Sequence, residues 1–445
     1  MPNNPVQIVL NDESFLRAPD PKRGGTDKDF FEGRDAAFVK HRDSLLAVLQ
    51  MIESDVARWP YGPLCYLRVR MRIEAIAKSY RPNRATFLAD QFPCVGAGAP
   101  GELYFRAPLI HFVRLRRHIA LAEERGETRI SRDSGRPYHY VSRNRCEVGA
   151  IETIELAPSN LKRSFAAEAA VTALSDPRAA SGYIVELFET QPLISSGDHD
   201  ALGFQRSLAT LQLVFREGGH GLLATLLPSP GGTPAIEMLL TDASEPARIE
   251  DRRIVRSKEE RVITPARLDR DLNRHERILQ LLAEHPLVRR IRFPILIEAT
   301  EVQAAGGPEP FPAIPRVADG SYPRVGIIDT GVDGPLTTWV RHRHDFLDRA
   351  DCDPSHGTLV AGVLIGAQAV NSPQLAVELD GCDIVDVPLM PSAPFGTVYG
   401  QRGFEAFLEE LEAALAEARD QHGVRVFNMS LNVVAPVDAD SYSLY

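Results

Sequence analysis

The chain of 445 residues has few cysteines, no long apolar run and no excess of positive charge. Its five cysteines are an odd number without metal-ligand spacing, which argues against a disulfide framework. No apolar stretch approaches the ~20 residues that a membrane-spanning helix needs. The net charge of −10 gives no electrostatic case for binding nucleic acid or an anionic membrane.

The first residues, from Met1 to Pro5, also lack the charged and then apolar pattern of a secretory signal. We therefore expect a reducing, cytoplasmic setting, with neither nucleic acid nor membrane as a partner. The remaining composition, 44% hydrophobic and 25% charged, is that of an ordinary globular protein. The length allows two or three domains.

Residues 1–303 read as an α+β accessory region without a catalytic motif. Apolar spacing predicts helices at 35–58, 109–124 and 166–174, and strands at 67–73, 182–188 and 208–215. In the first strand Leu67, Val69, Met71 and Ile73 alternate with arginines. This arginine row is either a phosphate-binding face or a solvated sheet face, and the acidic balance of the chain favours the second.

The end of this region and the linker after it are marked by composition. Residues 267–284 predict a charged amphipathic helix, and 289–297 a short strand. Residues 304–323 are dense in glycine and proline without apolar periodicity, which indicates a linker.

Residues 324–445 change to alternating strands and helices. The pattern predicts strands at 324–328, 383–389 and 424–429, with helices at 356–369 and 404–422. Buried strands that alternate with helices indicate the α/β class, with a doubly wound parallel sheet.

Two short motifs in this part carry the chemistry: Val-Gly-Ile-Ile-Asp-Thr-Gly-Val at 325–332 and Ser-His-Gly-Thr-Leu-Val-Ala-Gly at 355–362. Asp329 ends an apolar strand, and parallel sheets place their active sites at the carboxyl ends of strands. His356 opens a helix, with Ser355 at a plausible N-cap position. That helix is apolar almost all round, which predicts burial on every side.

Together the motifs resemble the Asp and His segments of the subtilisin-like serine proteases, the subtilases. Their order and their separation of 27 residues (356 minus 329) fit that family. The resemblance implies a triad in which Asp329 orients His356, and His356 takes the proton of a serine. The serine-bearing Gly-Thr-Ser-Met-Ala segment does not occur in the sequence. We therefore expect an incomplete subtilisin-like domain whose serine lies beyond Tyr445, and no peptidase activity from the 445 residues alone.

Two further segments resemble parts of the same family. Val426 to Leu431 resembles the strand that pairs with the substrate main chain, which implies that Ser430 and Leu431 line the substrate cleft. Asn432 stands where the family usually has glycine, so specificity does not carry over. Residues 250–300 resemble the end of a subtilase pro-region, which assists folding and inhibits the enzyme.

The resemblance therefore implies a serine endopeptidase that acts on protein or peptide substrates. The alternative is a catalytically inactive subtilase-like module that recognises a partner. An aspartic protease using Asp329 is a weaker reading, because it needs a second such aspartate from another lobe or subunit.

Cofactors and further partners follow only from the resemblance. Several subtilases bind calcium, and Asp348, Asp351 and Asp353 form a candidate cluster, although a solvated acidic loop is favoured. No other cofactor is expected. Some bacterial subtilases with long amino-terminal regions are encoded beside AAA-type ATPases, which makes such an ATPase a candidate partner.

Overall fold

The computed structural model describes fifteen stretches of the chain: 27–76, 80–130, 135–176, 178–189, 198–219, 221–227, 234–242, 248–255, 258–264, 267–299, 314–317, 320–366, 381–392, 395–399 and 403–434. The chain folds into two compact units, Met1–Ala157 with Ile194–Gly203, and Pro158–Leu193 with Phe204–Tyr445. Most of the linker expected at 304–323 lies outside the described residues. Within those stretches, no helix is long and apolar enough to cross a bilayer.

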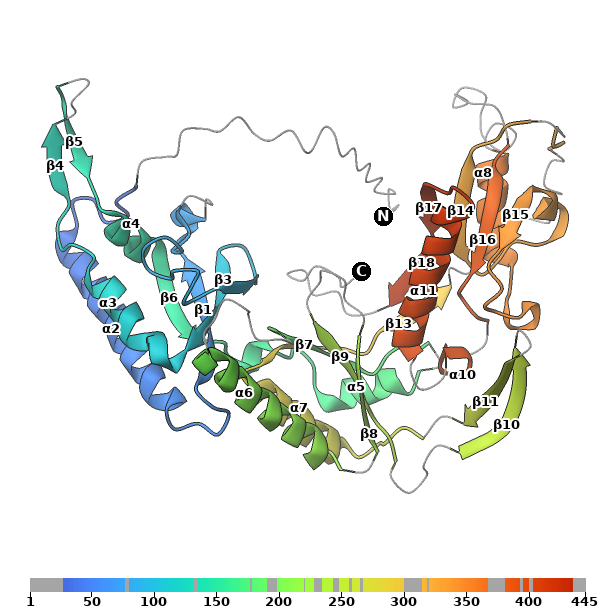
Figure 1. Cartoon of the computed structure of the whole chain (residues 1–445), viewed down its shortest axis with the longest axis horizontal. Helices are drawn as coiled ribbons and strands as arrows, with labels where there is room; N and C mark the ends of the chain where they lie inside the picture. Colours follow the sequence, from blue (N-terminus) through green and yellow to red (C-terminus); the bar gives the residue numbers. More distant parts are fainter. Residues whose placement is uncertain are drawn as a thin grey trace. The chain divides into compact units, whose positions relative to one another are not determined.

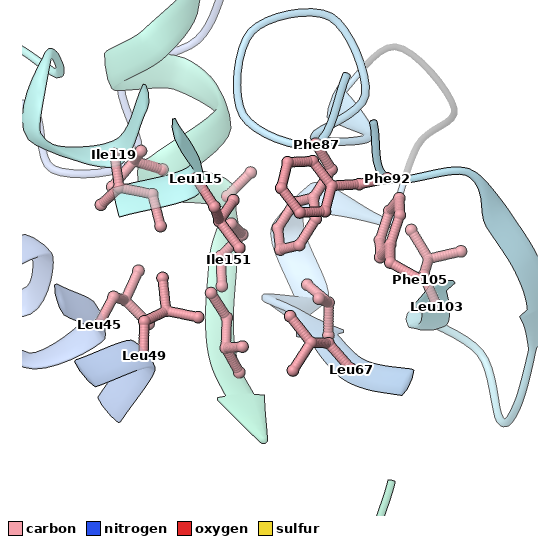
Figure 2. Packing of buried hydrophobic residues seen from close by; sticks show 14 of the residues in the cluster. Leu45, Leu49, Leu67, Phe87, Phe92, Leu103, Phe105, Leu115, Ile119 and Ile151 are labelled. Atoms are coloured by element: carbon pink, nitrogen blue, oxygen red, sulfur yellow. The ribbon is translucent and has the colours of Figure 1, made fainter. Parts of the chain in front are cut away.

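The first unit contains an antiparallel sheet in the order β2-β3-β1-β6. Its strands are β1 (Leu64–Met71), β2 (Cys94–Ala97), β3 (Glu102–Pro108) and β6 (Ile151–Leu156), and its helices are α2 (Asp35–Val56), α3 (Phe112–Ala120) and α4 (Arg143–Ala150). Strands β4 (Glu127–Ile130) and β5 (Pro137–Tyr140) form a separate hairpin. Figure 2 shows part of the core, in which Ile151 of β6 and Leu67 of β1 lie between leucines of α2 and the phenylalanines Phe87, Phe92 and Phe105.

The arginine row of β1 is occupied by partners from within the unit. Arg68 forms ion pairs with Glu102 and Glu155, and Arg72 donates to the carbonyl of Gly149. These internal partners favour the interpretation of the arginine row as a sheet face over a phosphate-binding face. The expected strand ends earlier than predicted, because Ile73 begins a 3-10 helix and is 80% exposed.

The second unit contains a β-α-β-β-α-β arrangement. Its elements are β7 (Tyr183–Leu187), α6 (Asp198–Glu217), β8 (Leu222–Leu226), β9 (Ala235–Leu240), α7 (Leu272–Glu284) and β12 (Val288–Arg292). All strand pairs are antiparallel, in the order β12-β7-β9-β8. Helix α5 (Ala167–Leu174) precedes this subdomain, and a hairpin of β10 (Arg248–Val255) and β11 (Lys258–Thr264) is inserted before α7.

Two sequence predictions in this subdomain are wrong. The strand expected at 208–215 lies within helix α6, where Phe204, Ser207, Leu211 and Val214 are buried. Their spacing of three and four residues is that of one helix face. The strand expected at 289–297 is divided between β12 and a second strand, β13 (Leu296–Ala299).

The last part of the unit contains the parallel sheet that the alternating pattern predicted. Its order is β15 (Val340–Arg343), β16 (Asp383–Pro388), β14 (Arg324–Asp329) and β17 (Val426–Met429), with every pair parallel. Helix α8 (Ser355–Ile365) and helix α11 (Gly403–Asp420) cover opposite faces (Figure 1). Successive residues of β14 follow this division, since Ile327 packs with the α8 cluster and Ile328 with the α11 cluster.

Edge strand β15 was not predicted, and its pairing contains an irregularity. Val340 is opposite Ile384, yet His342 is opposite Val385, so the register shifts by one residue between them. As a result His342 shares a face with Val385, on the α11 side, and Arg343 shares a face with Asp386.

The β-α-β-β-α-β subdomain packs directly against the α11 side of the parallel sheet. Ile184 and Ala235 share a core with aromatic residues of α10 (Phe395–Tyr399) and α11. The Glu237 carboxylate accepts hydrogen bonds from the backbone of Gly182, at 2.8 Å, and of Glu405 in the first turn of α11. Burial raises the pKa of Glu237 to about 7.

Candidate active site

The structure brings Asp329 and His356 together at one end of the parallel sheet. Asp329 is the last residue of β14, and His356 is the second residue of α8. The imidazole Nδ1 lies 2.9 Å from each carboxylate oxygen, and Asp329 is fully buried. Because side chains alternate along a strand, Asp329 shares the face of Ile327, which is the face that α8 covers.

The backbone around Asp329 fixes the carboxylate. The amide of Thr330 donates to Asp329 Oδ1 at 2.7 Å. The Asp329 carbonyl accepts from the amides of Leu389 and Met390, at 3.1 and 3.2 Å. Gly331 then turns the chain with a φ of 107°, a conformation that favours glycine.

Helix α8 contacts this turn closely enough to exclude a side chain at Gly357. The Gly357 amide donates to Thr330 Oγ1 at 3.2 Å, and the Asp333 amide donates to Thr358 Oγ1 at 3.0 Å. A Cβ on Gly357 would lie 2.3 Å from the carbonyl oxygen of Gly331. The absence of a side chain at Gly357 therefore allows α8 to approach the turn after Asp329 this closely.

Ser355 does not cap α8 as the sequence predicted. Its amide and its hydroxyl both donate to Asp353 Oδ1, at 3.1 and 2.5 Å, and these bonds hold the pKa of Asp353 below its usual value. Pro354 occupies the N-cap position, and its carbonyl accepts from Thr358. The Asp353 carboxylate is a strong acceptor two residues before Ser355, so the serine hydroxyl donates to it and does not accept a hydrogen bond from a helix amide.

The prediction that α8 is buried on every side is also wrong. Leu359 and Val363, one turn apart, are each 49% exposed. Ala361 and Ile365 face the sheet and are fully buried. The apolar composition of the helix therefore gives an apolar stripe on its outer face.

A second buried carboxylate, Asp386, supports the turn after Asp329. Its Oδ2 accepts from the Val332 amide at 3.2 Å and from Arg343 Nη1 at 2.7 Å. Burial raises the pKa of Asp386 to about 6, although Arg343 acts in the opposite direction. Sequence reasoning missed this residue, but a charged residue inside the apolar strand β16 was a usable signal.

Ser430 and Leu431 lie where the parallel sheet ends. Met429 is opposite Ile328, so Ser430 follows β17 as Asp329 follows Ile328 in β14. The Ser430 hydroxyl donates to Asn428 Oδ1 at 2.6 Å. Leu431 begins β18 (Leu431–Val434), which pairs in antiparallel fashion with β13, Leu431 being opposite Ala299.

The candidate calcium cluster gains no support from the geometry. The carboxylate of Asp353 is engaged by Ser355, as described above. Across the described stretches, one group of side chains is close enough to share a metal ion, and it consists of His342, Glu417 and His422. The sequence did not predict that group.

The arrangement of Asp329 and His356 has a definite chemical capacity. A carboxylate that accepts a hydrogen bond from Nδ1 keeps the proton on that nitrogen, so the basic lone pair is on Nε2. Such an imidazole is suited to take a proton from a nucleophile. No family model, curated protein or solved structure matches this chain. The function is therefore argued from the geometry and the motifs.

Proposed function

We propose that the chain is the amino-terminal part of a subtilisin-like serine endopeptidase. The observation that carries the proposal is the hydrogen bond between Asp329 and His356 at the carboxyl end of β14. In this proposal Asp329 orients the imidazole, His356 acts as the general base, and a serine outside the 445 residues is the nucleophile.

The position of the pair in the fold supports the proposal. Asp329 ends β14 and Ser430 follows the neighbouring parallel strand β17, at the edge where open parallel sheets bind ligands. The buried carboxylate, the glycine turn and the contact with Gly357 hold the pair on rigid elements, as catalysis requires. Ser430 and Leu431 would then line the substrate cleft.

We further propose that the β-α-β-β-α-β subdomain and β13 act as a pro-region. The subdomain packs on α10 and α11, and β13 follows it and pairs with β18. Because β18 begins at Leu431, β13 pairs with the chain just where the stretch proposed to pair with the substrate main chain ends, and Leu431 belongs to both. An antiparallel strand in that place would compete with substrate and so inhibit the enzyme. The proposed pro-region thus starts near Tyr183, well before residue 250.

The test uses the protein expressed from its complete reading frame, including any residues after Tyr445. We expect hydrolysis of a denatured protein substrate and labelling by a fluorophosphonate. His356→Ala should lower turnover by about 10⁴- to 10⁶-fold and Asp329→Asn by about 10⁴-fold.

The matched control is His139→Ala, since His139 Nε2 lies 2.9 Å from an Asp29 oxygen in the first unit. This second histidine–aspartate pair lies outside the proposed site, so turnover should be unchanged. Undiminished turnover in His356→Ala would refute the assignment of His356 as the general base. Absence of both hydrolysis and labelling in the unmodified protein would favour the inactive binding module, and co-purification would then identify a partner such as an AAA-type ATPase.

A further inference from the structure

Three histidines and two glutamates gather on the α11 face of the parallel sheet, away from the α8 face that carries Asp329. His342 and His344 come from β15 and the residue that follows it, two positions apart and so on one face. Glu410 and Glu417 are two turns apart on α11, and His422 lies in the turn after this helix. The five side chains thus come from a strand, a helix and a turn.

Three of these side chains face one another. The Nε2 atom of His342 lies 3.2 Å from Glu417 Oε1. The rings of His342 and His422 lie 4.0 Å apart, centroid to centroid, with 19° between their planes. One ligand atom from each of His342, Glu417 and His422 lies within 4.8 Å of the others.

The Nε2 atoms of His342 and His422 are shielded from solvent and make no hydrogen bond, and the 3.2 Å contact of His342 Nε2 with Glu417 Oε1 lacks the geometry of one. A buried polar atom without a hydrogen bond costs free energy, so two of them on stacked rings call for an explanation. A metal ion held between them would supply the partner that both nitrogens lack.

His344 has a different position in the cluster. Its Nδ1 lies 2.7 Å from Glu417 Oε2, and its Nε2 lies 2.7 Å from Glu410 Oε1. Both ring nitrogens are therefore engaged by carboxylates. The contact fixes one oxygen of Glu417 and leaves the other, Oε1, directed at His342, which is how outer residues orient metal ligands.

We propose that His342, Glu417 and His422 bind one zinc ion, with His344 as the residue that positions Glu417. Two imidazoles and one carboxylate suit zinc, whereas calcium and magnesium prefer oxygen ligands alone. Ligand atoms of a tetrahedral zinc site lie about 3.3 Å apart, given zinc–nitrogen distances of about 2.0–2.1 Å. The three ligand atoms, which lie up to 4.8 Å apart, must therefore approach one another by up to about 1.5 Å, and the two rings must turn from stacking so that both nitrogens point to one centre.

The proposed zinc ion would join edge strand β15 to the end of α11. An edge strand is paired on one side only, so a metal link to a packed helix would hold it in place. The proposal is independent of the protease proposal, because the two sites occupy opposite faces of the sheet and share no side chain.

The test uses the purified 445-residue chain after removal of metals with a chelator. Titration with Zn²⁺, followed by calorimetry, should show one equivalent bound, and Co²⁺ should give the visible absorption of a tetrahedral complex. Ca²⁺ and Mg²⁺ should not compete. Replacement of a ligand by Glu417→Gln should weaken zinc binding by at least about 100-fold, and His344→Ala by about 10- to 100-fold.

Two variants separate this site from other sources of zinc binding. His139→Ala removes a histidine of the first unit, and Asp348→Asn removes a carboxylate of the candidate calcium cluster; both variants should bind zinc as the unmodified chain does. Glu417→Gln keeps the shape of its side chain, and circular dichroism will show that it folds. The proposal is overturned if the unmodified chain binds no zinc, or if folded Glu417→Gln and His422→Ala bind it undiminished.

Discussion

The close contact between α8 and the Asp329 turn predicts an unusual effect of Gly357→Ala. At most helical positions this replacement stabilises a protein by about 1 kcal/mol, because alanine is the better helix former. Here the added Cβ would lie 2.3 Å from the Gly331 oxygen, whereas real contacts are essentially never under 3.0 Å. Helix and turn must therefore separate by at least about 0.7 Å.

The consequences can be worked out from the distances. Overpacking of this kind costs about 1–3 kcal/mol, so we expect net destabilisation where propensity alone predicts a gain. The same separation would take Asp329 and His356 from 2.9 Å to about 3.6 Å, which is too long for a hydrogen bond. If the complete protein is the proposed endopeptidase, a displacement near 1 Å is expected to lower its turnover by about 100-fold.

Tryptophan fluorescence provides the assay for stability. The chain has two tryptophans, and Trp339 is buried in the core that α8 shares with the sheet. In a Trp59→Phe background, Trp339 alone reports urea unfolding of this region. With a urea slope of about 2 kcal/mol per M, the midpoint should fall by about 0.5–1.5 M. Val363→Ala, at an exposed position of α8, is the control and should change stability by less than about 0.5 kcal/mol. A higher midpoint for Gly357→Ala would show that α8 does not touch the turn, and would refute the site geometry.

Two further outcomes are expected. The pKa of Asp386 is about 6 in the folded chain and ordinarily 3.8, so the stability linked to its protonated form is present below about pH 4 and lost as the pH rises through 6. Asp386→Asn should remove this loss of stability. Relative to the unmodified chain, the variant should therefore gain about 3 kcal/mol in free energy of unfolding between pH 4 and pH 7, measured by urea unfolding. Equal pH profiles of the two proteins would contradict the raised pKa of Asp386. Ile297→Ala should loosen β13, whose Ile297 side chain is buried in the α11 core, and so raise severalfold the activity of the proposed endopeptidase in its complete, unprocessed form. The same truncation at buried Ile52 of the first unit should not raise activity, and an equal rise in both variants would argue against inhibition by β13.

Much of the parallel sheet and the position of Asp329 could be predicted from the sequence. Helix α11 and strands β14, β16 and β17 have continuous or periodic apolar patterns, and local signals suffice for them. Strand β15 was missed because its four residues, Val-Arg-His-Arg, are mostly polar and owe their strand conformation to pairing with β16. Helix α6 was read as a strand because a short window of apolar residues fits both periods.

The side chains that depend on distant contacts could not be predicted. The group of His342, Glu417 and His422 spans 80 residues, and no fixed ligand spacing connects its members. The pairs His342 with His344 and Glu410 with Glu417 were the available signal, since each pair lies on one face of its element. Serine is a favoured residue at helix N-caps, so Ser355 was predicted to cap α8. Asp353, two residues away, instead accepts hydrogen bonds from both the amide and the hydroxyl of Ser355.

The register shift in β15 has a consequence for both faces of the sheet. With regular pairing, Arg341 would stand opposite Val385 and His342 opposite Asp386, so each side chain from His342 onward would cross to the other side. The imidazoles would then lie on the face of the buried Asp386, and the guanidinium of Arg343 would point at the glutamates of α11. The single additional residue in β15 thus places Arg343 beside Asp386 and the imidazoles beside α11. Its deletion is expected to disrupt both the support of the Asp329 turn and the proposed zinc site.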